Sequence, residues 1–260
     1  MNEWSIRRKR VIFLIAVLIL AIVLGVPLFF FFHQAPSCTD GKQDGDETGI
    51  DCGGSCALLC PADSLPMINN GDPQVLKVAS STYDVVAYVQ NPNVSGKVLD
   101  AAYTFDLYGA SSTIPLKTIQ GTTFIPKNSS FAIFEGPISF VEETPVRATF
   151  AWSGGLQWQK DTAPVPLLQV KDIVLSNANT SPRINAQLEN DSLGSVSNIE
   201  LGALIFDQNG NIIAASKTVV DSIDAGQSAP LVFTWPTAFS SATTSIEILP
   251  RIFPDNSFIK

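Results

Sequence analysis

Residues 11–32 read VIFLIAVLILAIVLGVPLFFFF, which is 22 consecutive positions without a charged or hydrogen-bonding side chain. At about 1.5 Å of rise per residue, a helix of this length extends roughly 33 Å, enough to cross the hydrocarbon core of a bilayer. The stretch therefore predicts a transmembrane helix over 11–32, with the lipid bilayer as its partner. Every later residue would then lie on one side of a membrane.

Four basic residues, Arg7, Arg8, Lys9 and Arg10, directly precede this stretch. Clustered Lys and Arg stay on the cytoplasmic side, so residues 1–10 are predicted to be a cytoplasmic tail. Residues from 33 onward are predicted to lie outside. The prediction is a single-pass protein of the cell membrane with an extracytoplasmic C-terminal region.

Two other interpretations of the N-terminus fit the sequence less well. A cleaved signal peptide has an apolar core of about 7–15 residues followed by a small-x-small site. Here the apolar stretch is longer, and the sequence after it offers no such site. A lipoprotein would be acylated at Cys38, but residues 35–37 (APS) lack the usual Leu. A retained anchor is preferred, and lipidation is the minor alternative.

Composition limits the functions of the exterior. The net charge of the whole chain is -8, and nearly all of the acidic residues follow the anchor. An acidic exterior argues against nucleic acid as a partner. The single histidine, His33, falls at the membrane edge. Serine, cysteine and zinc hydrolases that use an imidazole are therefore not expected. The sequence predicts a protein that is not an enzyme, with a carboxylate-dependent envelope hydrolase as a remaining alternative.

All four cysteines, Cys38, Cys52, Cys56 and Cys60, lie in residues 33–62, which we call the collar. In an oxidising compartment they predict two disulfides, with three connectivities open. The collar is similar to a C-x-D-G-x-x-(N/D)-G-x-E-T-x-x-D-C-G-G-x-C module of extracytoplasmic proteins.

The acidic residues of the collar suggest calcium as a candidate cofactor. If Asp40 is position 1 of a twelve-residue loop, Asp44, Asp46 and Asp51 fall at positions 5, 7 and 12. Lys42 stands where a further ligand is required, however, so the other interpretation is a solvated turn series pinned by disulfides. A calcium-stiffened spacer is the corresponding alternative function.

A repeat organises the rest of the chain. Apolar residues recur 99 positions apart, with one further pair 98 apart. The pairs are Val85/Ile184, Ala87/Ala186, Val89/Leu188, Asn91/Asn190, Phe105/Leu204, Leu107/Phe206, Ile133/Val232, Phe134/Phe233, Phe140/Phe239, Phe150/Leu249 and, 98 apart, Ile125/Ile223. The predicted domains are 74–158 and 166–252, with linkers at 63–73 and 159–165 and a tail at 253–260.

Each copy is predicted to be an antiparallel β-sandwich. Residues 184–189 alternate apolar and polar side chains, as a half-buried strand does. Asn209-Gly210 between apolar stretches is a hairpin signal. Six or seven short strands in about 90 residues are typical of an immunoglobulin-like sandwich. The fold class is therefore mainly β: one transmembrane helix, a small Cys-rich segment and two tandem Ig-like sandwiches.

Short motifs carry a resemblance to known families. Residues 105–108 (FDLY) resemble the F-x-L-Y-D signature, with Gly109 in place of its Asp, and residues 204–207 (LIFD) match it less closely. The stretch ending in residues 91–93 (NPN) is similar to late-embryogenesis-abundant type 2 domains. The resemblance implies Ig-like domains on envelope proteins and no active site.

Two groups of residues allow a functional and a structural interpretation. Asn91 and Asn190 are interpreted as turn residues that bond their own backbone, rather than as ligand contacts. Trp152, Trp158 and Trp235 would suit a carbohydrate platform, but large rings at strand ends usually cap a sandwich core. The leading hypothesis is a non-enzymatic envelope protein that presents its domains to an unknown protein or polymer partner.

Overall fold

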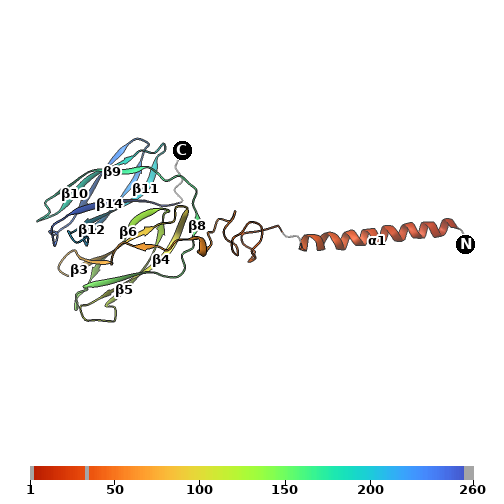
Figure 1. The fold of residues 1–260 in the computed structure, drawn as a ribbon, viewed down its shortest axis with the longest axis horizontal. Helices are drawn as coiled ribbons and strands as arrows, with labels where there is room; N and C mark the ends of the chain where they lie inside the picture. The colour runs from red at the N-terminus through yellow and green to blue at the C-terminus, as the bar shows by residue number, and fades with distance from the viewer. Residues whose placement is uncertain (1–2, 33–34, 255–260) are drawn as a thin grey trace. The chain divides into compact units, whose positions relative to one another are not determined.

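The computed structural model describes residues 3–32 and 35–254. The chain divides into two units, Met1–Cys56 and Ala57–Lys260, which are described separately. In the first unit, helix α1 extends over Glu3–Phe32, so the predicted tail continues into the helix (Figure 1). Within it, Arg7–Phe30 is long and apolar enough to cross a membrane, a property that membrane spans share with signal sequences.

The collar is held by disulfides and by glycines in unusual backbone conformations. One disulfide joins Cys38 and Cys56, and Cys52 and Cys60 are disulfide-bonded as well. Gly53 has a φ of +79°, and a Cβ there would lie 1.8 Å from Thr48 Oγ1. The C-G-G-x-C motif therefore needs glycine because this turn has no room for a side chain.

The second unit contains a short 3-10 helix, η1 (Pro61–Asp63), followed by two β-sandwiches. Sandwich 1 contains β1 (Ile68–Asn69), β2 (Gln74–Lys77), β3 (Thr82–Asn91), β4 (Gly96–Tyr108), β5 (Lys117–Ile125), β6 (Ser129–Ser139), β7 (Arg147–Trp152) and β8 (Gln159–Lys160). Sandwich 2 contains β9 (Leu168–Ser176), β10 (Arg183–Asn190), β11 (Val196–Phe206), β12 (Ile212–Ile223), β13 (Ser228–Thr234) and β14 (Ser245–Ile252).

All strand pairs are antiparallel, and the two sandwiches share one strand order. In sandwich 1, β3 pairs with β2 and β6, and β4 pairs with β5 and β7. In sandwich 2, β10 pairs with β9 and β13, and β11 pairs with β12 and β14. Strand β1 lies inside the stretch predicted as a linker, because Ile68 pairs with Gln90 of β3.

Each sandwich has its own apolar core between its sheets. The buried core of sandwich 1 includes Val85, Val89, Val98, Phe105, Leu107, Ile125, Phe131 and Trp158. The buried core of sandwich 2 includes Ile184, Leu188, Ile199, Leu201, Ile205, Leu231 and Phe233.

Beyond β3, the 99-residue spacing predicted for all pairs but Ile125/Ile223 is wrong. Asn91 Nδ2 donates to the carbonyl of Gly96, five residues on, whereas Asn190 Nδ2 donates to Gly194, four residues on. The second turn is thus one residue shorter, and matched positions after it lie 98 apart.

The strand registers show the new spacing. Phe105 pairs with Phe150 in β4–β7, and Ala203 pairs with Ile248 in β11–β14. The structural counterpart of Phe105 is therefore Ala203, not Leu204. A shift of one residue moves a side chain to the other face of its strand, so Leu204 lies outside the core of sandwich 2.

Candidate functional site: the seam between the two sandwiches

A third apolar cluster lies between the sandwiches. It consists of Leu76, Val86, Leu204, Phe206, Ile212 and Ala215, with Tyr88, Ala132, Phe134 and Leu249 packed against it. We call this cluster the seam. Its members come from β2, β3 and β6 on one side and from β11, β12 and β14 on the other. The two sandwiches therefore pack through one sheet of each.

Two of the strands that meet at the seam, β3 and β11, are apolar on both faces there. In β3, Val85 lies in the core of sandwich 1 and Val86 lies in the seam. In β11, Ile205 lies in the core of sandwich 2 and Leu204 lies in the seam, and both are 0% exposed. Successive side chains of a strand point to opposite faces, so a strand that is apolar on both faces needs two apolar partners.

Arg251 of β14 lies beside the seam and contacts residues of sandwich 1. Its side chain is buried and lies over the rings of Phe124 and Phe131, 3.8 and 4.4 Å from their centroids. It donates hydrogen bonds to Thr123 Oγ1 and to the carbonyl of Phe124, and it pairs with Glu200 at 3.5 Å. Burial lowers the pKa of Arg251 to about 10, so the guanidinium stays charged at neutral pH. A residue of sandwich 2 is thus bonded into sandwich 1.

Other polar groups lie at the remaining edges of the seam. Tyr88 Oη donates to Glu247 Oε2 at 2.9 Å across the two sandwiches. Burial, together with this bond, raises the pKa of Tyr88 to about 12. Lys217 lies 5.8 Å from the ring centroid of Phe134. Burial raises the pKa of Asp84 to about 6, and the nearby Lys217 opposes that shift.

Two cavities flank the seam. One, of about 520 Å³, is lined by both sandwiches and contains Tyr103, Glu135, Glu200 and Arg251. Tyr103 Oη donates to Glu135 Oε1 at 2.5 Å, and burial raises the pKa of the Tyr103 hydroxyl above its usual value. The other cavity, of about 730 Å³, is lined by β2, Asp84, Phe134, residues 211–217 and residues 234–240.

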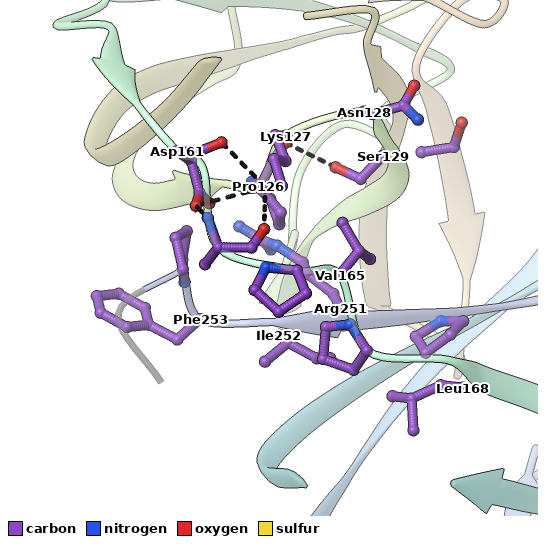
Figure 2. Close-up of a pocket in the computed structure, with 16 residues that line it drawn as sticks. Pro126, Lys127, Asn128, Ser129, Asp161, Val165, Leu168, Arg251, Ile252 and Phe253 are labelled. Atoms are coloured by element: carbon purple, nitrogen blue, oxygen red, sulfur yellow. Dashed lines mark hydrogen bonds and ion pairs between the residues drawn. The ribbon is translucent and has the colours of Figure 1, made fainter. Parts of the chain in front are cut away.

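A smaller cavity of about 290 Å³ lies beside the segment that connects the sandwiches (Figure 2). Two of its charged groups, Lys127 and Asp161, contact each other. Lys127 Nζ donates to the carbonyls of Asp161, at 2.9 Å, and Ala163, and it lies 3.5 Å from Asp161 Oδ1. The same carboxylate oxygen accepts the Ala163 N–H at 3.0 Å. These contacts fix the connecting segment to sandwich 1 and leave little hydrogen-bonding capacity for a ligand.

The two asparagines singled out from the sequence have equivalent bonds. Asn91 and Asn190 are both 0% exposed. Each side chain donates to two backbone carbonyls and accepts a backbone N–H two residues on, from Asn93 and Ser192 respectively. The interpretation as turn residues that bond the backbone is confirmed.

We expect Asn91→Ala to lower the free energy of unfolding by about 2–3 kcal/mol, because buried backbone groups lose their partners. Asn190→Ala is expected to have a similar effect, since its bonds are equivalent. Urea denaturation of the full-length chain measures both. An effect below about 0.5 kcal/mol, the range of ordinary surface substitutions, would contradict this role.

The tryptophans do not form a single platform. Trp158 is buried in the core of sandwich 1, and Trp152 packs edge-on against Phe150 with ring centroids 5.1 Å apart. Trp235 belongs to sandwich 2 and lines the 730 Å³ cavity.

The four collar aspartates serve mostly as hydrogen-bond acceptors. Asp51 accepts the Gly41 N–H, Asp40 accepts the Lys42 N–H, and Asp46 accepts the Ser55 hydroxyl. Asp44 Oδ1 is buried without a partner among the described residues. Among the described residues, Cys38, Glu47 and Cys56 are the group of three whose ligand atoms lie within 4.8 Å of one another, and none of the aspartates belongs to it. Because both of those cysteines are disulfide-bonded, this group does not fit a metal site either, and calcium stays a prediction.

These features define a protein with one apolar helix and two β-sandwiches packed through a seam. No protein-family model matches the chain, and no curated protein matches it. Among solved structures it is similar to one described as "The structure of a beta-glucuronidase from glycoside hydrolase family 2". The identity is 13%, the TM-score is 0.25, and the match covers 87% of this chain but 28% of that one. A similarity this low says nothing about activity.

Proposed function

We propose that the chain is a single-pass protein of the cell membrane whose sandwiches form a non-enzymatic interaction module outside the membrane. The observation that carries the proposal is the apolar helix followed directly by a collar with all of its cysteines oxidised. Disulfides persist in oxidising compartments, and the basic residues 7–10 favour a cytoplasmic N-terminus.

The proposal includes a duplicated Ig-like domain of the kind that the F-x-L-Y-D and late-embryogenesis resemblances imply. The shared strand order supports duplication. In that motif, Phe105 and Leu107 are core residues of β4, which is a structural role.

Membrane orientation tests the proposal directly. In intact cells, a C-terminal tag is expected to be digested by added protease and an N-terminal tag to be protected. The chain is expected to stay in the membrane pellet after alkaline carbonate extraction. A soluble mature chain that begins after residue 32 would contradict the anchor.

Partner capture tests the interaction role. Photo-crosslinking in intact cells is expected to join residues of 57–260 to an envelope component. As a control, the same crosslinking groups placed in residues 35–56 of the full-length chain are expected to give no such product. An equal product from residues 35–56 would contradict the role of the sandwiches.

A further inference from the structure

The 730 Å³ cavity beside the seam has the size and position of a ligand site. Binding cavities commonly measure about 300–1,000 Å³ and often lie between domains. Sandwich 1 contributes residues 74–78, Asp84 and Phe134, and sandwich 2 contributes residues 211–217 and 234–240.

One wall of this cavity is aromatic. Trp235 Nε1 donates to the carbonyl of Ala215 at 3.0 Å, which satisfies the indole N–H and fixes the ring. Phe239 packs edge-on against it, with ring centroids 5.2 Å apart and planes at 76°. Trp235 is partly exposed. An indole held in this way offers an apolar surface with a polar tip already bonded.

The cavity is also lined by two charged groups, Asp84 and Lys217, without a hydrogen bond or a close ion pair among the described residues. Among the described residues, none donates a hydrogen bond to the Asp84 carboxylate, although this group is half-buried. Lys217 lies over the Phe134 ring, and no carboxylate is paired with it within the described part of the chain. A half-buried carboxylate without a hydrogen bond is costly unless a ligand supplies one.

These walls restrict the chemistry of the ligand. A purely apolar ligand would leave Asp84 and Lys217 without hydrogen bonds. A polyanion would be repelled by the acidic exterior. Hydroxyl groups both donate and accept, so they can bond the carboxylate and the ammonium together, while the C–H face of a sugar ring packs on an indole.

We propose that this cavity binds a pyranose saccharide, which stacks on Trp235 and bonds Asp84 and Lys217 through its hydroxyls. The inference rests on the proposed interaction function and names the class of partner. A wall polysaccharide and a protein-linked glycan share this chemistry.

Asp84 is expected to lower stability in the absence of ligand. Its pKa is raised from 3.8 to about 6 by burial, so the folded state binds more protons than the unfolded state between these values. Stability is then highest at low pH and falls as pH rises toward 6. Asp84→Asn should therefore raise the melting temperature at pH 7.5 and leave it nearly unchanged below pH 4. A lower melting temperature at pH 7.5 would contradict this.

The binding test uses the full-length chain in a zwitterionic detergent without a sugar headgroup. Isothermal titration with cellotetraose, maltotetraose and chitotetraose is expected to show binding of at least one. Asp84→Asn and Lys217→Gln should each weaken that binding by about tenfold or more, as expected for bonds to charged groups. Asp106→Asn, on the exposed face of β4, is the matched control and should change nothing.

Asp84→Asn separates binding from folding, because it is expected to weaken binding while it stabilises the protein. Two measurements distinguish a wall polysaccharide from a protein-linked glycan. Co-sedimentation with insoluble cellulose and chitin reports binding to a polysaccharide, and retention of ovalbumin reports binding to a protein-linked glycan. No binding to any probe at millimolar concentration, or binding unaffected by both cavity variants, would overturn the inference. Partner capture that persists without saccharide binding would leave the proposed function standing.

Discussion

Leu204→Glu is expected to lower the free energy of unfolding of residues 57–260 by about 5 kcal/mol or more, because it buries a charge without a partner. Leu204 is 0% exposed and lies in the seam rather than in either core. Leu204→Ala should cost about 3 kcal/mol through loss of packing. Urea unfolding of the full-length chain, followed by circular dichroism, measures both.

Two controls separate a seam effect from a core effect. Val174→Glu alters an exposed residue of β9, so its effect should stay within about 0.5 kcal/mol. Leu188→Ala alters the core of sandwich 2 and should cost about 3 kcal/mol without separating the sandwiches. A Leu204→Glu protein as stable as the parent would show that the seam does not form.

Arg251→Ala is expected to lower the free energy of unfolding by about 3–4 kcal/mol. The variant loses the ion pair with the half-exposed Glu200, the bonds to Thr123 and Phe124, and the packing on two rings. Glu200 is about half exposed, so water can solvate it once its partner is gone. This limits the loss to less than a fully buried pair would cause.

Arg183→Ala is the matched control for Arg251→Ala. Arg183 is exposed at the start of β10, and among the described residues its side chain bonds only Asn185. Its removal should change stability by about 0.5 kcal/mol or less. If the two arginine variants lowered the free energy of unfolding equally in the same urea series, Arg251 would not stabilise the packing of the two sandwiches.

The sequence predicted the elements well because their signals are local. The apolar stretch at 11–32, the strict alternation at 184–189 and the Asn-Gly turn at 209–210 each specify a helix, a strand or a hairpin with no knowledge of distant residues. The helix and the β-sandwich class are confirmed.

The repeat was predicted with an error of one residue. Matching Phe105 with Leu204 gave an apolar pair, but the structural counterpart is Ala203. Both faces of β11 are apolar, so either register looks acceptable by sequence. The signal that could have decided it was the turn after each buried asparagine, which is one residue shorter in the second copy.

The seam was not predicted, although its signal is present. Residues 85–89 (VVAYV) and 203–206 (ALIF) are apolar at consecutive positions, while their partners in the other copy alternate or carry polar residues. An Ig-like strand with one exposed face should alternate. The contacts of Arg251 could not be predicted, because Thr123 and Phe124 lie more than one hundred residues away in sequence.

The central claim is that the two sandwiches form one body through the seam. Pulsed hydrogen exchange across a urea series, read by mass spectrometry on peptides from β4 and β13, tests it most directly. The account predicts one shared unfolding midpoint in the parent chain and separate midpoints in Leu204→Glu. Separate midpoints in the parent chain would contradict it.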